Sequence, residues 1–314
     1  MSDLDIICVG AAAVDIVAIV EQIPRVDDIV LAERVEKHAG GSTANVSVGL
    51  ARLGLSVGFV GKLVNDEYGN FLLEDFKRNN IDTTHVIIEN KGHTASCFIV
   101  VDKKGQRIIV ALGGTAIINN AKELNLDYFK VPLVYIGESL PAIALNITNY
   151  VHDNGGRVVY APGGLFVKSG VQYLEPILTH ADFLLFSKTE ILTLTNTKNV
   201  WSGIKELKKL SNGKIVVTLG RNGVMYWDGN TVYRTTAFEV KHICDTTGAG
   251  DAFTAGFLLG LLKLKDPLQA IEVGEAVAAI KIQHYGARGG LPSWETVEQF
   301  LKKNHIDIVK LDLK

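Results

Sequence analysis

The regular alternation of strand-like and helix-like segments after residue 132 constrains the fold of this chain most strongly. Short apolar, β-branched runs have the length of strands, and the stretches between them have helical periodicity. The strands are expected at 133–136, 157–160, 182–186 and 214–219, and the helices at 140–152, 170–179 and 199–210. Strands that alternate with helices build a parallel sheet covered by helices on both faces. The pattern predicts a doubly wound, mostly parallel α/β fold.

The first third of the chain contains two kinds of strand. Residues 5–9 and 57–63 are continuous apolar runs, typical of strands buried in a parallel sheet, and helical periodicity follows them at 42–53 and 67–78. Other segments are β-rich with hairpin-like breaks, at 16–20, 29–36, 94–101 and 107–112, with a tight turn at 102–105. We expect one domain over residues 1–314, with a small discontinuous β-sheet from about 16–37 and 94–112 that covers a cleft as a lid.

The last third completes this plan with two short strands and three helices. The strands are expected at 223–227 and 231–235, and the helices at 249–262, 267–284 and 293–303. Many glycines follow the apolar runs, which is where strands turn into helices in an α/β sheet.

The charge balance argues for a small-molecule substrate. The 314 residues carry 32 Lys+Arg and 34 Asp+Glu, a formal charge of −2. A nucleic-acid-binding protein normally shows a basic patch or stripe, so nucleic acid is not an expected partner. The sequence has no apolar run long enough to span a membrane and begins with acidic rather than basic residues. We therefore expect a cytoplasmic protein without a membrane partner.

Several familiar chemistries are excluded by the absence of their motifs. The three cysteines, Cys8, Cys97 and Cys244, are far apart and lie in apolar runs, so we expect three core residues rather than a zinc or redox pair. The sequence has no P-loop motif, no GxGxxG after the first strand and no GxSxG. These absences disfavour a P-loop NTPase, a dinucleotide dehydrogenase and an α/β-hydrolase.

The sharpest local feature is the sequence DTTGAGDAF at residues 245–253, where an extended segment meets a strongly helical run. Gly248, Ala249 and Gly250 have almost no side chain, so their amides can approach an anion at a helix N-terminus. Asp251 in the first turn is placed to take a proton from an attacking hydroxyl. The alternative is structural: Asp251 interacts with the helix dipole, and the glycines only permit a tight turn.

A second cluster precedes the first expected helix. Gly40 and Gly41 let the backbone approach a polar ligand, and Asn45 offers a donor and an acceptor, although Ser42 as a helix cap behind a glycine turn is an equally simple interpretation. Weaker candidates follow individual strands, and each has a structural alternative as a cap, a turn or an exposed side chain. They are Asp15, Glu138, Glu190, Thr218, Gly220 and Gly223.

Together these segments resemble the ribokinase-like carbohydrate kinases, also called the PfkB family. Residues 245–257 are close to the C-terminal signature of that family, and residues 40–54 resemble the N-terminal one. Residues 217–223, residues 286–292 and residues 9–15 also match, so the resemblance covers nearly the whole chain in the family's order. It implies transfer of the ATP γ-phosphate to an alcohol, usually a hydroxymethyl group of a sugar or nucleoside. It also implies a doubly wound α/β domain with a β lid that commonly forms homodimers.

The resemblance also implies roles for individual positions. Asp251 matches the catalytic base, and Gly248, Ala249 and Gly250 match the anion hole. Substrate-binding positions correspond to Asp15, Gly40, Gly41 and Asn45, with Glu138 as an addition. ATP-binding positions correspond to Thr218, Gly220 and Gly223. Glu190 corresponds to a position tied to Mg²⁺ and phosphate, and Asp245, Thr247 and Ala287 fall near a monovalent-cation (K⁺) site seen in many members.

The chain departs from the family pattern in ways that bear on metal and substrate. The N-x-x-E motif reads Ser187-Lys188-Thr189-Glu190, so Ser replaces Asn beside the metal-linked glutamate. Ala13 and Ser42 stand where ribokinases tend to have Asn and Lys, which argues against ribose, and the missing Lys disfavours a phosphorylated sugar. We therefore expect an unphosphorylated sugar as acceptor.

Two alternatives to a sugar kinase remain at the level of sequence. A nucleoside kinase of the same family would need aromatic side chains around a base, for which Phe98 and Tyr68 are candidates. A sensor without catalysis would be expected to lack the base or the anion hole, and this sequence retains both.

Overall fold

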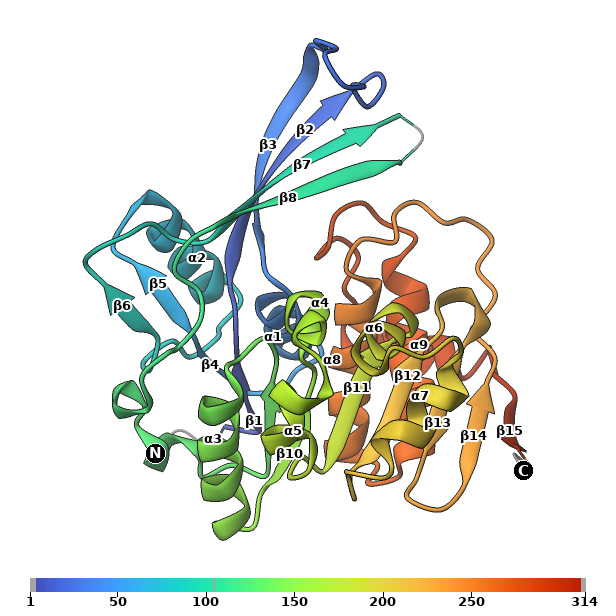
Figure 1. The fold of residues 1–314 in the computed structure, drawn as a ribbon. Helices are drawn as coiled ribbons and strands as arrows, with labels where there is room; N and C mark the ends of the chain where they lie inside the picture. The colour runs from blue at the N-terminus through green and yellow to red at the C-terminus, as the bar shows by residue number, and fades with distance from the viewer. Residues whose placement is uncertain (1–3, 104, 312–314) are drawn as a thin grey trace.

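The computed structural model describes residues 4–103 and 105–311, which form a large sheet between two helical layers and a small sheet that projects from it (Figure 1). Over these residues the large sheet has nine strands in the order β15-β14-β13-β12-β11-β10-β9-β1-β4. Their bounds are β1 (Ile6–Val9), β4 (Val57–Val60), β9 (Leu133–Ile136), β10 (Arg157–Tyr160), β11 (Phe183–Ser187), β12 (Lys214–Thr218), β13 (Val224–Trp227), β14 (Val232–Thr235) and β15 (Ile308–Leu311). In this sheet the neighbours from β4 through β1, β9, β10 and β11 to β12 pair in parallel. The neighbours from β12 through β13 and β14 to β15 pair antiparallel. The predicted doubly wound α/β fold is confirmed.

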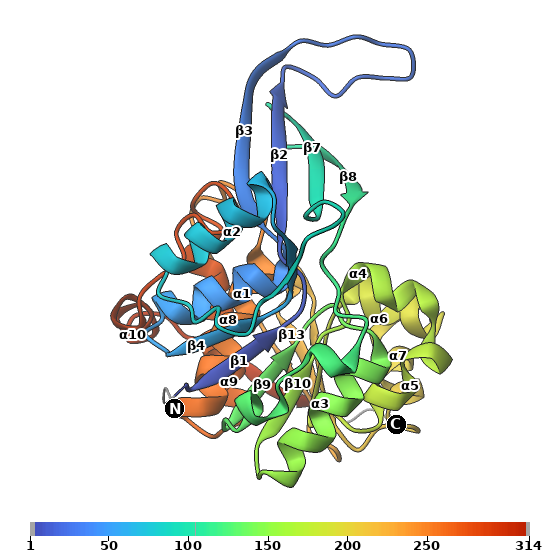
Figure 2. The same cartoon turned by 90° about the vertical axis from the view of Figure 1, so that its left-hand side faces the viewer.

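Two helical layers bury both faces of this sheet (Figure 2). One layer contains α1 (Ser42–Arg52), α2 (Glu67–Arg78), α8 (Ala249–Lys263), α9 (Pro267–Lys281) and α10 (Trp294–Leu301). The other contains α3 (Pro141–Asp153), α5 (Val171–Leu178), α6 (Lys188–Thr195) and α7 (Val200–Leu207), with the short α4 (Gly163–Phe166) nearby. Alternate residues of one strand enter different cores: Ile6 and Cys8 pack into the first, Ile7 and Val9 into the second. This explains why the parallel strands are apolar throughout.

The small sheet stands above the carboxyl ends of the parallel strands (Figures 1 and 2). Its order is β3-β2-β7-β8, with β2 (Ala13–Val20), β3 (Ala32–Gly40), β7 (Ser96–Asp102) and β8 (Arg107–Gly113). The antiparallel pairing of β7 with β8 agrees with the predicted hairpin, and Lys104 in its turn lies outside the described residues. A third sheet pairs β5 (Lys62–Val64) with β6 (Ile87–Glu89).

The structure corrects several expected boundaries. The run predicted as one strand over 57–63 is divided between β4 and β5, because the chain leaves the large sheet at Gly61 and pairs with β6. The strand expected at 29–36 begins and ends later, as β3. Its pairing with β2 continues through His38, opposite Asp15, to Gly40, whereas Ile29 lies outside the strand and is exposed. Helices α4 and α6 and strand β15 were not predicted. Helix α4 has only four residues, and α6 begins directly after the last residue of β11.

The cysteine prediction is correct for Cys8 only. Cys8 is buried, whereas Cys97 and Cys244 are half-buried, and Cys97 lies opposite Asp15 in the small sheet. Among the described helices, none combines the length and the apolar character needed to cross a membrane.

Candidate active site

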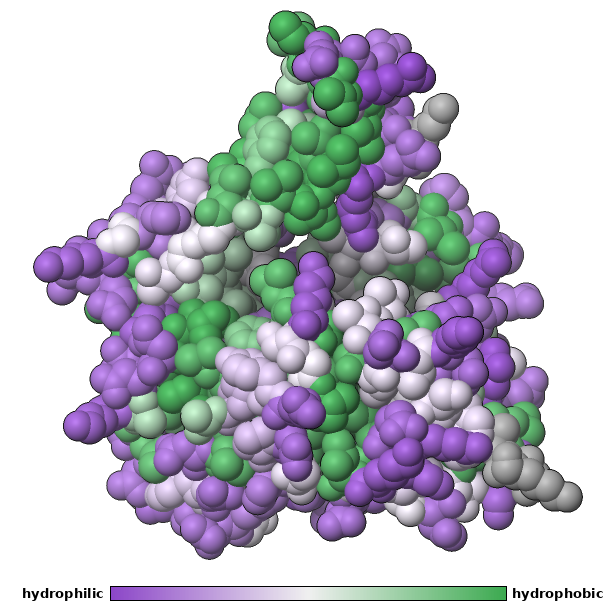
Figure 3. Space-filling view, viewed as in Figure 1, coloured by the Kyte–Doolittle hydropathy of each residue, from purple (hydrophilic) through white to green (hydrophobic). Residues whose placement is uncertain are grey.

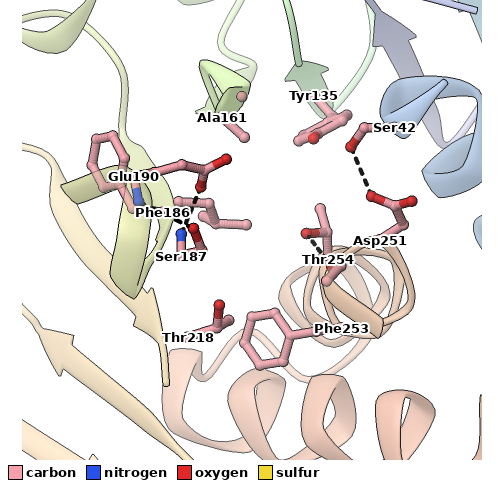
Figure 4. A pocket seen from close by; sticks show the side chains of 13 residues that line it. Ser42, Tyr135, Ala161, Phe186, Ser187, Glu190, Thr218, Asp251, Phe253 and Thr254 are labelled. Carbon is pink, nitrogen blue, oxygen red and sulfur yellow. Dashed lines mark hydrogen bonds between the residues drawn. The ribbon is translucent and has the colours of Figure 1, made fainter. Parts of the chain in front are cut away.

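A cavity of about 130 Å³ opens where several parallel strands end beside the N-terminus of α8 (Figure 4). Asp251 and Gly250, from the first turn of α8, line one side together with Ser42. Glu190 follows β11, and Thr218 is the last residue of β12. Both line the opposite side of the cavity (Figure 4). The cavity therefore lies at the carboxyl edge of the sheet, where open α/β folds bind ligands.

Asp251 is a half-buried carboxylate held by two residues of α1. Ser42 Oγ donates to Oδ1 at 2.7 Å, and Asn45 Nδ2 donates to Oδ2 at 2.7 Å. Burial raises the pKa of Asp251, and these two hydrogen bonds and the charge of Arg288 oppose that rise. The Asp251 carboxylate is thus oriented by two donors, and its surroundings favour neither protonation state alone.

The packing of α1 against α8 sets these hydrogen bonds. Gly49 of α1 faces Ala255 of α8 so closely that a Cβ on Gly49 would lie 2.8 Å from the Ala255 Cβ. The small residue lets the two helices approach. Ser42 is the first residue of α1 and Gly41 is its N-cap, so the interpretation of Ser42 as the cap is wrong.

Arg288 is a residue of this site whose role the sequence analysis missed. Its Nε donates to Asn45 Oδ1 at 2.8 Å, one terminal nitrogen pairs with Asp75, and the other is buried without a hydrogen-bond partner among the described residues. Arg288 also opposes the burial-driven rise in the pKa of Asp15. Its place in the segment 286–292 was the available signal, but nothing in the sequence indicated the contact with Asn45.

The helix α8 begins with a backbone that few residue types can adopt. Gly248 is the N-cap with φ of 74°, and a Cβ there would lie 2.6 Å from the carbonyl oxygen of Ala287. Gly248 has no side chain to cap the first turn. The amide of Ala249 donates to the Thr246 carbonyl at 3.2 Å, so the amides on either side of it are the ones left to an anion. Gly250 lines the cavity, and a Cβ built on it would meet open space.

The other predicted substrate positions gather near Asp251. Asp15 in β2 lies beside Gly40 at the end of β3, and Gly41 contacts the backbone of 11–13. Glu138 follows β9 and is half-buried, and it accepts a hydrogen bond from Thr43 Oγ1 at 2.9 Å. Burial raises the pKa of Glu138 to about 7, and the charge of Asp251 adds to the rise.

The predicted ATP positions are only partly brought to the cavity. Thr218 lines it, whereas Gly220 and Gly223 form the turn between β12 and β13 and are not part of its wall. In that turn the amide of Leu219 donates to the carbonyl of Gly223 at 2.8 Å. The hairpin-turn interpretation of these two glycines therefore describes their local structure, and any contact with a nucleotide would occur outside the cavity.

Glu190 takes part in a capping box. Ser187 is the N-cap of α6 and accepts from the Glu190 amide at 3.2 Å, while Glu190 Oε2 accepts from the Ser187 amide at 2.7 Å. The other carboxylate oxygen points into the cavity (Figure 4). Serine in place of the family's asparagine thus fixes the orientation of Glu190. In residues 4–103 and 105–311, no three His, Cys, Asp or Glu side chains cluster as a metal site.

The three residues predicted near a monovalent cation lie together at the N-terminus of α8. The Asp245 carboxylate accepts from the amides of Thr247 at 2.8 Å and Gly286 at 2.9 Å, and Ala287 lies against Gly248. Arg107, from β8 of the small sheet, donates to Thr247 Oγ1 at 2.5 Å. This contact joins the small sheet to the loop that precedes α8.

The fold and the cavity define a phosphotransferase that acts on a small molecule. The chain belongs to the pfkB family of carbohydrate kinases, whose family model matches residues 3–294. It is 29% identical over 299 residues to the ribokinase of Bacillus subtilis (strain 168), covering 94% of this chain and 99% of the relative. It is 27% identical over 302 residues to a nucleoside kinase of Methanocaldococcus jannaschii, covering 96% and 98%. The structure of a Thermotoga maritima ribokinase aligns with a TM-score of 0.84 at 27% identity, covering 96% and 100%.

Proposed function

We propose that this chain transfers the γ-phosphoryl group of ATP to a hydroxymethyl group of an unphosphorylated sugar. The observation that carries the proposal is that one cavity has Asp251 and Gly250 on one side and Glu190 and Thr218 on the other. An acceptor hydroxyl beside Asp251 and a terminal phosphate beside Thr218 would then meet in front of the α8 amides. Such positioning supplies most of the catalysis in phosphoryl transfer.

Asp251 would act as the general base. Its carboxylate is oriented by Ser42 and Asn45 before any substrate binds, and its pKa is raised by burial. A base whose pKa lies closer to neutrality accepts a hydroxyl proton more effectively while still being ionised. The amides of Gly248 and Gly250 would stabilise the charge that develops on the transferred group, and the amide of Ala249 would join them on leaving the Thr246 carbonyl to which it donates at 3.2 Å.

The acidity of the site supports a neutral acceptor. Asp15, Glu138 and Asp251 lie close enough that the charge of Asp251 raises the pKa of each of the other two. A phosphorylated sugar would add negative charge to this cluster, which is unfavourable. Polyol hydroxyls, in contrast, can donate hydrogen bonds to carboxylates.

Glu190 would hold Mg²⁺ together with the ATP phosphates. One of its oxygens points into the cavity, and Mg²⁺ usually takes one or two carboxylates with substrate phosphates completing its ligands, so the residues fit this ion. When bound, the ion neutralises phosphate charge. Gly220 and Gly223 remain the proposed contacts with the rest of the nucleotide.

The small sheet is the proposed lid, and its outer face is the proposed homodimer surface. Asp15, Cys97 and Ala111 are register partners and share one face. Phe98 and Val110, each one position away from Cys97 and Ala111, are partners on the opposite face. On that face Val35, Phe98, Ile108 and Val110 are all exposed, and apolar side chains gather over the sheet in Figure 3. Exposed apolar patches of this kind mark association sites.

Val110→Asp should shift the chain toward monomer in light scattering coupled to size exclusion. The matched control is Ile109→Asp, an exposed neighbour on the inner face, which should leave the mass unchanged. A wild-type monomer, or equal effects of both variants, would remove the dimer proposal.

A nucleoside kinase is the second candidate, supported by the similarity to the Methanocaldococcus jannaschii enzyme. The two aromatic residues considered for a base pocket do not favour it. Phe98 lies on the outer face, and the ring of Tyr68 lies under the Lys37 ammonium at 5.7 Å.

The test is ADP release with Mg²⁺ and ATP against a panel of neutral sugars, phosphorylated sugars and nucleosides. We expect turnover with one or more neutral sugars. Turnover with nucleosides alone would replace the proposal with the second candidate, and turnover with phosphorylated sugars alone would contradict the neutral acceptor.

A further inference from the structure

Lys281, near the C-terminus of α9, is a fully buried lysine that the proposed reaction does not use. Its Nζ donates to the backbone carbonyl oxygen of Asp245 at 2.9 Å. A lysine is almost never buried completely unless its charge has a partner. The position of this ammonium, against the loop that precedes α8, therefore requires an explanation.

The loop around Asp245 is fixed by contacts on every side. Its carboxylate accepts from the amides of Thr247 and Gly286, and its carbonyl accepts from Lys281. The amides of Cys244 and Asp245 both donate to the Ile282 carbonyl at the end of α9. Lys281 thus closes the junction between the end of α9 and the start of α8, where Gly248 begins the anion site.

The ammonium of Lys281 interacts electrostatically with Asp251 as well as with Asp245. Burial lowers the pKa of Lys281, while the charges of Asp245 and Asp251 oppose that change. Arg107 is a second cation nearby, paired with Thr247 Oγ1 and 3.9 Å from the Asp245 carboxylate. The loop that would bind developing negative charge therefore already lies beside two positive side chains of this chain.

We propose that the buried ammonium of Lys281 is a built-in monovalent cation that orders the 245–248 loop, so that the kinase needs no K⁺. The resemblance to carbohydrate kinases implied a K⁺ site at Asp245, Thr247 and Ala287, and these residues do lie together. However, the backbone carbonyl of Asp245 already accepts from Lys281, and a second cation beside the ammonium would be repelled. The residues present therefore do not fit K⁺ in addition to Lys281, which acts as a positioning residue.

The test compares wild type with Lys281→Ala, which leaves space for an ion, and Lys281→Met, which removes the charge but fills the space. Lys303→Ala, at an exposed lysine, is the surface control. Each protein is measured in NaCl, KCl and ethylammonium chloride at equal ionic strength. The readouts are the melting temperature, which needs no substrate, and turnover, which rests on the proposed function.

Wild type and Lys303→Ala should behave alike in all three salts. Lys281→Ala should melt at a lower temperature and lose turnover by about tenfold or more in NaCl, and K⁺ or ethylammonium should restore much of both. Lys281→Met should show the same loss without recovery.

If K⁺ activates or stabilises wild type more than Na⁺ does, the proposal is overturned. This comparison uses wild type alone, so it tests the proposal even if both Lys281 variants fail to fold. Equal losses for Lys281→Ala in every salt also overturn it, as does wild-type behaviour of that variant. If no acceptor supports turnover, the proposed function fails, while the melting temperatures still decide the role of Lys281.

Discussion

Two Gly→Ala substitutions, two residues apart at the start of α8, should differ in their effect on stability: only the one at Gly248 should destabilise the fold. Gly248 has φ of 74°, and a Cβ there would lie 2.6 Å from the Ala287 carbonyl oxygen. Gly250 has no atom within 4 Å of the corresponding Cβ position and lines the cavity. The first substitution strains the fold, whereas the second places a methyl group where the transferred phosphoryl group is proposed to lie.

The magnitudes follow from these two environments. A non-glycine residue held at positive φ costs roughly 1–3 kcal/mol, and the contact with backbone adds to this cost at Gly248. Alanine at Gly250 removes unfolded-state freedom within a helical turn, so stability should stay equal or rise by at most about 1 kcal/mol. Blocking access to the anion-binding amides should reduce kcat about 10²–10³-fold, the usual effect of losing one oxyanion donor.

Urea unfolding and ADP release, measured on both variants and on wild type, separate the two effects. Gly250→Ala should unfold at the same or a higher urea concentration than wild type and be nearly inactive. Gly248→Ala should unfold at a clearly lower concentration. If Gly250→Ala kept turnover within about tenfold of wild type, the α8 amides could not be the anion site. Equal destabilisation of both variants would refute the structural reasoning.

Two further predictions concern the carboxylates around the cavity. Asn45→Ala removes a donor to Asp251 and leaves Arg288 Nε unpaired, so it should destabilise the fold by about 1–3 kcal/mol. The ionised Asp251 also loses a hydrogen bond, so the acidic limb of the kcat/KM profile should move to higher pH. An unmoved limb would contradict the assignment of Asp251 as the base. The pKa of Glu138 is about 7 in the folded protein against an ordinary 4.5, so the folded state holds this proton more tightly than the unfolded state. The resulting contribution to folding stability is complete below about pH 4.5 and is lost as the pH rises through 7. The difference corresponds to roughly 3 kcal/mol, and Glu138→Gln should flatten this part of the stability–pH curve, which an unchanged slope would disprove.

The sequence was sufficient to predict the elements that recur along the chain. Apolar runs such as Ile6–Val9 and Leu133–Ile136 read as buried strands because both of their faces enter a core. The sequence also predicted that the glycine-rich segments gather at one end of the sheet. Parallel strands carry the loops after their carboxyl ends at the same edge.

The contacts between distant segments could not be predicted in the same way. Arg288 meets Asn45, 243 positions away, only because α1 packs closely against α8. Lys281 reads in sequence as an ordinary charge at the end of a helix, and its burial is decided by the turn that Asp245 makes. The capping box of Ser187 and Glu190 is local, but the sequence comparison with the family drew attention to the missing asparagine instead.

The most direct test of the proposed mechanism is turnover of Asp251→Asn with the acceptor that the ADP-release panel identifies. The amide keeps the size of the side chain but cannot accept the hydroxyl proton, so turnover should fall about 10²–10⁴-fold while ATP binding, followed by calorimetry, stays close to wild type. Turnover within about tenfold of wild type would contradict the assignment of Asp251 as the general base.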